Sequence, residues 1–415
     1  MRRQHLPGVA AAARVSTPRL ALMVSADLGL SFCWVLKYAL ATPHLAHTLG
    51  ASAAVSHALW ALGPLTGLLA PLIGTLSDGH TSRYGRRRPF VAAGAAASVV
   101  GMTVFAWAGS VLPAGRGVAT VVAFAGFGLW DVGLQAMLFP SRALLADILP
   151  ADRQHDVQAV AAVLAGVAEV TAGGLVWSMA EPVASIRSLL AGGAAVLLLT
   201  TAVSLVLCVE TPTDGSVRVG DVELATIGDG DAWWEGHNGE PRRAATSSVA
   251  APFLEGPSPN GVTSSVTIFS AASVVKAVAG LAFGGCYPMF LRSLGGGGER
   301  TLLGGPLGAY AVVLWAVAGT RSGWVAGFAV AAAAVPFVVT QTIPVAMVVT
   351  PPGGGSAGAG GRGVNLGVLN LACVVPQLLD TCYTGWVAGR FGEAAVLRIG
   401  GAWAAASAAA AFVLL

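Results

Sequence analysis

Residues 128–147 read GLWDVGLQAMLFPSRALLAD, and residues 117–127 before them read GVATVVAFAGF. The combined segment is apolar and long enough to cross a lipid bilayer as one helix. Two charged side chains interrupt it, Asp131 near its middle and Arg142 eleven residues later. A carboxylate at mid-membrane costs at least about 2.5 kcal/mol, so its presence there indicates a watery cavity and a function.

The composition predicts an all-α, multi-pass protein of the plasma membrane or an organelle membrane. Of the 415 residues, 55% are hydrophobic and only 10% are charged, and the mean hydropathy is +0.72. Soluble domains carry roughly 25% charged residues. The net charge of +3 is too small to suggest nucleic-acid binding. The five cysteines are scattered without the spacing of a metal site or a disulfide framework, which predicts free thiols.

The sequence contains no pattern of residues that would indicate an enzyme. It lacks a nucleophile–base–acid set, a cluster of metal ligands and a phosphate-binding loop. We therefore expect neither catalysis nor a cofactor.

Eleven apolar runs have the length of membrane-spanning helices. Six of them predict an N-terminal six-helix bundle over residues 21–208, and five predict an incomplete C-terminal bundle over residues 265–415. Between the bundles, residues 209–264 are rich in Gly, Ser, Pro and acids, which predicts a polar, disordered loop. The runs lie near residues 21–43, 53–77, 89–109, 118–145, 157–178, 187–208, 265–291, 302–320, 324–349, 364–388 and 395–415.

Arginines concentrate in the first twenty residues and in alternate connections. Residues 1–20 contain four arginines and no acid, which is typical of a cytoplasmic tail and also of a transit peptide. Further arginines lie in residues 83–89 and 141–156. Loops rich in Lys and Arg stay in the cytoplasm, and each pair of helices returns the chain to the same side. The pattern therefore predicts a cytoplasmic tail over residues 1–20 and a cytoplasmic loop over residues 209–264.

The connection after the second run, residues 74–89, reads GTLSDGHTSRYGRRRP. Its first glycine permits close helix approach, its aspartate ends the helix, and its last glycine permits a tight turn into three arginines. Such a loop can pair acids with bases at one membrane face and hold one conformation of a transporter whose two halves rock against each other. The predicted gating residues are Gly74, Asp78, Gly85, Arg86, Arg87 and Arg88.

This loop resembles the signature loop of the major facilitator superfamily. Its longer form, TSRYGRRRP, resembles the narrower family of glycoside–pentoside–cation symporters, which includes plant sucrose transporters and their animal melanosomal relatives. Residues 34–43, WVLKYALATP, resemble the first helix of that family. Residues 131–147 resemble its fourth helix, and residues 364–377, VNLGVLNLACVVPQ, resemble its eleventh.

The resemblance implies two six-helix bundles around a central site, and proton-coupled symport of sucrose or a related disaccharide or glucoside. The partners it implies are a sugar, protons and the lipid bilayer, and no obligate protein partner is evident. Asp131 matches the family's proton-coupling acid, and Arg142 matches its substrate-linked arginine. Eleven residues turn an α-helix by about 1100°, close to three full turns. The two side chains therefore share one helix face, provided that Pro140 does not kink the helix.

The chain also departs from the family pattern. Lys37 replaces a neutral amide or an acid, and we expect it to reach the Asp131 carboxylate. Glu169 replaces an asparagine. The predicted substrate-binding residues are Arg142, Lys37, Glu169, Asn370 and Gln377.

The segment matching the family's seventh helix is missing. This absence and Lys37 keep a second hypothesis open, a transport-inactive relative that acts as a sensor or interaction protein.

Overall fold

The computed structural model describes residues 15–150, 153–179, 182–210, 259–294, 298–320, 322–349 and 362–414; side chains at the start of the 259–294 range and at scattered positions elsewhere are not described. The N-terminal half contains α2 (Thr17–Met23), α3 (Ala26–Pro43), η1 (His44–Thr48), α4 (Ala53–Ala58), η2 (Leu59–Ala61), α5 (Leu62–Gly67), α6 (Ala70–Asp78), α7 (Arg88–Trp107), η3 (Ala108–Ala114), α8 (Arg116–Ile148), α9 (Gln154–Ser178) and α10 (Ile186–Leu207). The C-terminal half contains α12 (Pro259–Leu294), α13 (Gly298–Val317), α14 (Gly323–Ala332), α15 (Ala334–Val349), α16 (Arg362–Phe391) and α17 (Glu393–Leu414).

The protein is an integral, multi-pass membrane protein. In the described ranges, nine helical segments are long and apolar enough to cross a membrane, or ten when the bent pair formed by α2 and residues 26–48 is one span. Each of the eleven predicted apolar runs falls on one helix or on a short series of helices. Two predicted boundaries differ, because α2 begins at Thr17 within the predicted tail and α12 begins at Pro259 within the predicted central loop.

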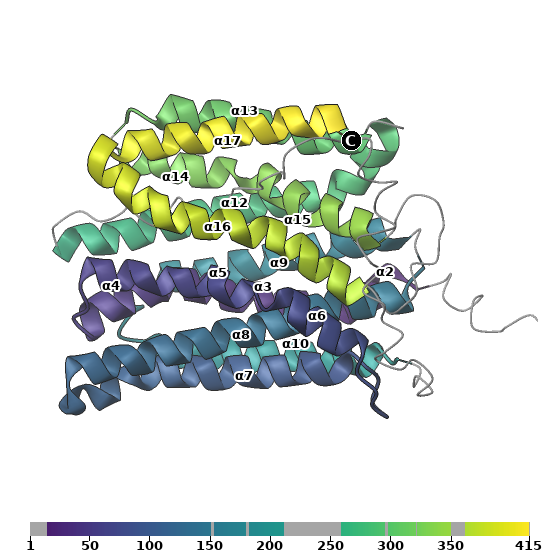
Figure 1. Ribbon diagram of the computed structural model, residues 1–415, viewed down its shortest axis with the longest axis horizontal. Coiled ribbons are helices and arrows are strands. Elements are labelled where there is room, and N and C mark those ends of the chain that lie inside the picture. Colours follow the sequence, from purple (N-terminus) through teal and green to yellow (C-terminus); the bar gives the residue numbers. More distant parts are fainter. Residues whose placement is uncertain are drawn as a thin grey trace, which may run out of the picture.

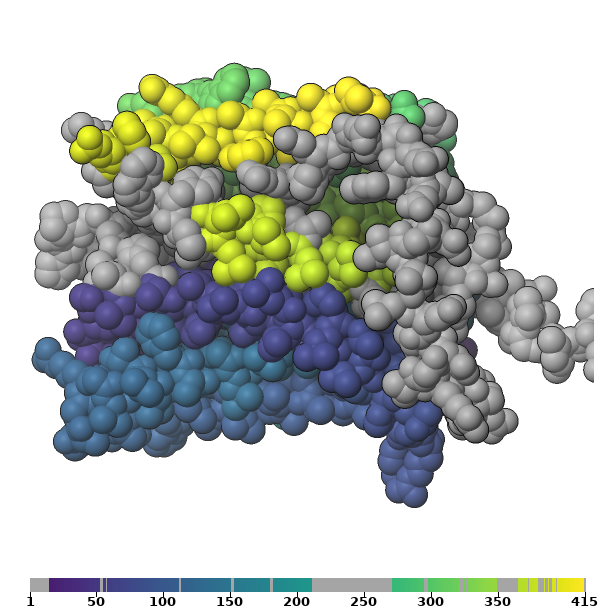
Figure 2. All heavy atoms as spheres, in the orientation of Figure 1, coloured from purple at the N-terminus to yellow at the C-terminus, as the bar shows by residue number. Residues whose placement is uncertain are grey.

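The two halves form adjacent bundles whose helices run along a common direction (Figure 1). They meet where α9 packs against α12 and where α16 packs against α6. In the space-filling view, α16 lies between the N-terminal half and α17 (Figure 2). Helices from both halves therefore meet along the boundary between the two bundles.

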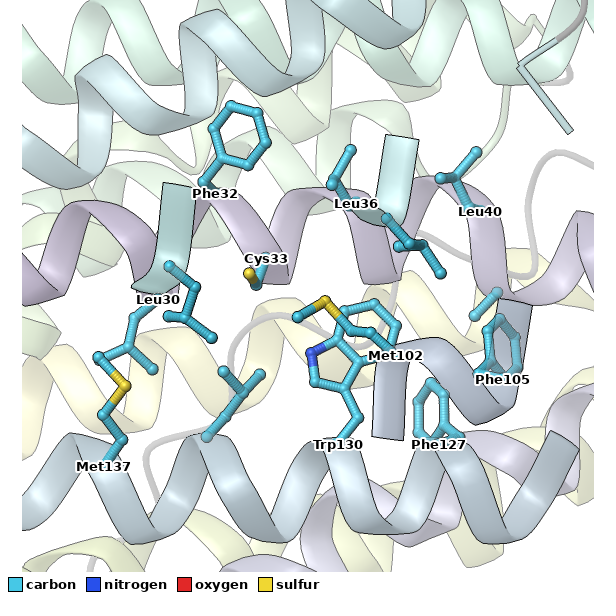
Figure 3. Close-up of a cluster of buried hydrophobic side chains, with 14 of the residues drawn as sticks. Leu30, Phe32, Cys33, Leu36, Leu40, Met102, Phe105, Phe127, Trp130 and Met137 are labelled. Carbon is cyan, nitrogen blue, oxygen red and sulfur yellow. The ribbon is translucent and has the colours of Figure 1, made fainter. Parts of the chain in front are cut away.

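The core of the N-terminal half lies between α3, α7 and α8 (Figure 3). Phe105, Phe127 and Trp130 are fully buried there and contact one another through their rings. Small residues let α7 and α8 approach closely, as in other membrane helix pairs. A β-carbon added at Gly94 would lie 2.7 Å from the carbonyl oxygen of Gly133 on α8. This packing fixes α8, which carries both Asp131 and Arg142.

The end of the bundle that carries Arg86–Arg88, here called the arginine-rich end, also carries the last described residue before the gap. Glu210 bonds to the backbone there, and the C-terminal end of α12 lies at the same end, because Arg292 pairs with Asp156 at 3.2 Å. An α-helix of 36 residues is about 54 Å long, so the first turn of α12 lies at the opposite end. The described chain thus stops at the arginine-rich end with Glu210 and resumes at the opposite end with Pro259. The predicted loop and the missing seventh helix fall mainly on residues 211–258, which lie outside the described residues.

Candidate functional site: a charged cavity between the two halves

A cavity opens between the two halves, with about 750 Å³ of space including its mouth. Helices α3, α8 and α9 form its N-terminal wall, and α12 and α15 form its C-terminal wall. The polar and aromatic lining residues are Asp27, Ser31, Trp34, Arg142, Gln158, Glu169, Lys276, Phe337, Gln341 and Thr342.

Arg142 and Asp27 bring opposite charges to the N-terminal wall. Asp27 is 7% exposed and belongs to α3, whereas Arg142 is half-buried on α8. No hydrogen bond or ion pair joins the Asp27 carboxyl to any described residue, and the buried Nε of Arg142 has no hydrogen-bond partner. Both residues line the same cavity. The pair therefore leaves donors and acceptors available to a ligand or to water.

Glu169 and Lys276 link the two walls of the cavity. The Lys276 Nζ lies 3.3 Å from Glu169 Oε2, and it also lies 4.4 Å from the centre of the Phe337 ring. Because Glu169 belongs to α9 and Lys276 to α12, this ion pair joins the two halves. Both side chains are partly exposed, at 15% and 21%.

Amides, hydroxyls and one indole complete the lining. The side-chain amides of Gln158 and Gln341 each carry two donors and an acceptor, and the hydroxyls of Ser31 and Thr342 both donate and accept. Trp34 adds an apolar face with one N–H donor. This combination suits a neutral molecule with many hydroxyl groups and one or more apolar faces.

Asp131 and Lys37 form a buried pair apart from this cavity. The Lys37 Nζ donates to Asp131 Oδ1 at 2.5 Å, and the two side chains are 5% and 2% exposed. Lys37 also lies 5.4 Å from the ring centres of Tyr38 and Phe127. The predicted contact is confirmed, but neither residue lines the cavity. The second oxygen of Asp131 has no hydrogen-bond partner in the described residues.

Each acid on α3 or α8 lies at the level of a base on the other helix. α8 ends at the arginine-rich end, whereas α3 starts near it, since α2 packs against the last turns of α8. The two helices are therefore antiparallel. Asp27 and Lys37 on α3 thus face Arg142 and Asp131 on α8, acid to base at both levels. The predicted shared face of α8 is the face toward α3.

Two other predicted residues lie on α16. The Asn370 Nδ2 donates to the carbonyl oxygen of Gly67 on α5 at 2.9 Å, so it bonds the C-terminal half to the N-terminal half. Gln377 is half-buried and is not among the cavity-lining residues. Substrate binding by either residue remains a prediction.

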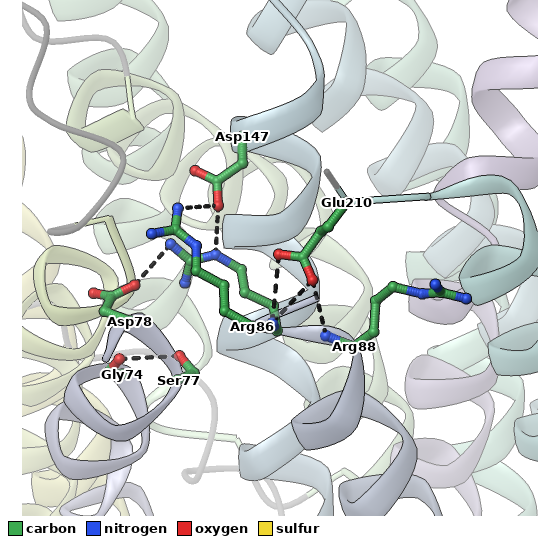
Figure 4. Close-up of polar contacts among 8 residues, drawn as sticks. Gly74, Ser77, Asp78, Arg86, Arg88, Asp147 and Glu210 are labelled. Carbon is green, nitrogen blue, oxygen red and sulfur yellow. Dashed lines mark hydrogen bonds and ion pairs between the residues drawn. The ribbon is translucent and has the colours of Figure 1, made fainter. Parts of the chain in front are cut away.

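The predicted gating loop forms a network of ion pairs at the arginine-rich end (Figure 4). The guanidinium of Arg87, fully buried, pairs with Asp78 at 2.7 Å and with Asp147 at 2.6 Å. Arg86 also pairs with Asp147, at 2.7 Å. This network ties α6 and α7 to the end of α8.

The glycines and the last arginine shape the same loop. α6 ends at Asp78, as predicted, and Gly74 accepts a bond from the Ser77 hydroxyl within that helix. Gly85 has φ +98°, which side chains disfavour, and the Glu210 carboxylate occupies the place of a β-carbon there. The Glu210 carboxylate accepts backbone N–H bonds from Arg87 and Arg88.

Asp27 and Lys276 are charged cavity residues that the sequence analysis did not assign to the site. Asp27 lies in the first apolar run, ten residues before Lys37. The available signal was the order of charges, because both the first and the fourth run carry an acid followed by a base ten or eleven residues later. If the two helices pack antiparallel, each acid lies opposite a base. Lys276 is one of two lysines in the chain, and its contact with Glu169 required the placement of the two halves.

Comparison with known proteins shows the same kind of fold and a partial sequence match. No protein-family model matches the chain. It is 35% identical to the sucrose transport protein SUC3 of Arabidopsis thaliana over 155 residues, and 31% identical to SUT4 of Oryza sativa over 170 residues. These matches cover 34% and 38% of this chain but only 26% and 28% of the relatives. The similarity therefore spans less than a third of the length of these curated relatives.

Solved structures of transporters share the fold over almost the whole chain. A bacterial homologue of the iron transporter ferroportin, in its outward-facing state, matches with a TM-score of 0.67, and a D-xylose–proton symporter matches with 0.62. Both matches cover 96% of this chain, at 14% identity. The chain therefore has the two-bundle fold of major facilitator transporters.

Proposed function

We propose that the protein carries a sugar across its membrane by alternating access, together with a proton. The observation that carries this proposal is the cavity between the two bundles, with charged, amide, hydroxyl and aromatic groups on its walls. Sucrose is the leading substrate because the curated relatives are sucrose transport proteins. A related disaccharide or glucoside has the same kind of hydroxyl groups and is the next candidate.

Within this proposal Arg142 and Glu169 bind substrate, as predicted from the sequence. The free donor of Arg142 can bond a sugar hydroxyl, and a guanidinium stays charged throughout the cycle. Glu169 lies in an ion pair between the halves, and substrate hydroxyls can compete for its oxygens. A bound substrate that weakens this ion pair would then make it easier for one half to move against the other.

Coupling of transport to protons requires a carboxyl that binds and releases a proton. The sequence assigns this role to Asp131, and the Lys37 ammonium beside it sets a condition. The Lys37 ammonium already occupies one oxygen of the Asp131 carboxylate, so coupling through Asp131 would require Lys37 to move away. The role of Asp131 therefore stays a prediction.

The same pair favours a second candidate function. A fixed cation on the coupling acid suits a protein that binds a sugar without accumulating it, such as a sensor. The two candidates differ in one measurable property, which is whether a proton gradient concentrates the sugar.

The test uses the purified full chain in proteoliposomes. Sugar exchange, measured with labelled sucrose on one side and unlabelled sucrose on the other, reports transport without proton coupling. Accumulation driven by an imposed proton gradient reports symport. We expect both activities, and we expect Arg142→Gln to lose both while keeping the folded state. Sugar binding without either activity would support the sensor, and absence of exchange and of binding for sucrose and related glucosides would exclude both.

A further inference from the structure

Two buried carboxyls lie on the facing surfaces of α3 and α8, in contrasting surroundings. Asp131 is held by an ammonium at 2.5 Å and lies away from the cavity. Asp27 lines the cavity and has no ion pair within 4 Å among the described residues. A carboxylate without a partner is much more costly to bury than a paired one, so the charged form is less favourable at Asp27 than it would be beside an ammonium.

The charged groups around Asp27 come from three helices. α8 contributes Arg142, and α9 contributes Glu169 beside the amide of Gln158. α12 contributes Lys276, which is paired with Glu169. α10 and α15 contribute no charged side chain to the cavity. Arg142 is thus the one cation of the cavity lining that is not already paired with an acid.

Arg142 and Asp27 line the same cavity and form no ion pair within 4 Å. The unpartnered Nε of Arg142 can donate to a water or a sugar hydroxyl in the cavity, and such a molecule can in turn bond the carboxylate. When that bridge is present, the carboxylate is stabilised. When the cavity is dry, the protonated carboxyl is the less costly form.

We propose that Asp27, rather than Asp131, is the carboxyl that takes up the proton at the cavity. The Asp27 carboxylate accepts a proton from water at the open mouth and later returns it to water on the other side. Arg142 supplies the charge that replaces the proton when it leaves. Lys37 and Asp131 stay paired throughout, as a structural link between α3 and α8. The transport of this proton rests on the proposed symport, whereas the titration of Asp27 does not.

The first test measures titration without any sugar. Infrared difference spectra of the purified protein detect the C=O band of a carboxyl that gains a proton on acidification. We expect Asp27→Asn to lose the band of one buried carboxyl. The double variant Lys37→Met/Asp131→Leu should keep that band, as should Glu299→Gln, which removes a carboxyl from the first turn of α13 outside the cavity. Persistence of the whole signal in Asp27→Asn, or its loss in the double variant, would overturn the proposal.

Arg142→Gln provides a second measurement if Asp27→Asn does not fold. Without the cation, the carboxyl should gain its proton at a higher pH, so the band should appear earlier during acidification. An unchanged onset would show that Arg142 does not act on the titrating carboxyl.

Sugar transport is measured separately on the same samples. Asp27→Asn should lower accumulation driven by the proton gradient by a larger factor than it lowers sugar exchange, whereas Asp27→Glu should retain part of the accumulation. If the wild-type protein shows no sugar exchange, the proposed function fails, while the infrared result still decides whether Asp27 titrates. Full accumulation by Asp27→Asn would refute its part in coupling.

Discussion

The Lys37 ammonium lies 2.5 Å from Asp131 Oδ1, and both side chains are almost completely buried. This pair joins α3 to α8 at the level of the aromatic core. Neutralising one partner leaves a buried charge without its counter-ion, which costs about 3–5 kcal/mol in folded proteins. Replacing both partners with apolar side chains of similar volume is often nearly neutral.

We therefore expect Lys37→Met and Asp131→Leu each to lower the stability of the protein by about 3 kcal/mol, and the double variant to recover most of it. Thermal unfolding of the purified protein in detergent measures all four members of this cycle. If the stability losses of the two single variants simply add in the double variant, the ion pair contributes nothing to the stability of the protein. Recovery together with intact proton-driven accumulation would assign the pair a structural role.

Glycine at the α7–α8 contact allows a second prediction. A β-carbon at Gly94 would lie 2.7 Å from the Gly133 carbonyl oxygen and 2.8 Å from the Met137 nitrogen, both backbone atoms that cannot move alone. Gly94→Ala should force the helices apart and destabilise the protein by about 1–3 kcal/mol.

Gly174 on α9 is the matched control, because a β-carbon there has no neighbour within 4 Å. Gly174→Ala should be neutral, or more stable by up to about 1 kcal/mol, since alanine favours the helix. Equal unfolding temperatures for both variants would contradict the close approach of α7 and α8.

The ion-pair network at the arginine-rich end gives a third prediction. The buried Arg87 guanidinium reaches Asp78 on α6 and Asp147 on α8 at the same time. A lysine ammonium is a point charge without this planar fork, so it cannot hold both carboxylates in the same geometry. We expect Arg87→Lys to loosen this end and to raise the labelling rate of a cysteine placed at Ser77, which is fully buried.

Arg83→Gln is the control for this measurement, because Arg83 is exposed and its side chain bonds to the neighbouring Tyr84. That variant should label at the wild-type rate. If Arg87→Lys labels no faster than Arg83→Gln, the network does not hold the end closed.

Much of this architecture follows from the sequence because bilayer-spanning helices have an obligatory length and composition. The conformation of the loop over residues 74–89 was also predictable. Gly85 adopts the positive φ that its place in the turn suggested, and the acid of the loop, Asp78, pairs with an arginine of the loop, Arg87. Local patterns determine both features.

The cavity was harder to predict, because it depends on which helix faces meet. Asp131 appeared to be the isolated acid only as long as α8 was considered alone. Packing against α3 gave it a partner and left Asp27 without one. Likewise, the bond between Asn370 and Gly67 depends on the placement of one half against the other, which no local pattern records.

The ion pair between Glu169 and Lys276 leads to the last prediction, on the balance between conformations. It joins α9 to α12 across the two halves at 3.3 Å, and both side chains retain some exposure. A partly exposed pair contributes at most about 1 kcal/mol, which corresponds to roughly a fivefold change in a two-state equilibrium. Glu169→Gln should therefore shift the protein toward conformations in which the two helices lie farther apart.

Spin labels on the outer faces of the two helices can measure this shift. Val167 on α9 and Val278 on α12 are 37% and 53% exposed, so labels there leave the cavity unchanged. In a background without the exposed native Cys286, Glu169→Gln should broaden the distance distribution toward longer distances. The exchanged pair Glu169→Lys/Lys276→Glu should restore the distribution, because attraction between the helices is regained with the charges reversed. Identical distributions in the wild-type protein and Glu169→Gln would show that this ion pair does not bias the two halves toward each other.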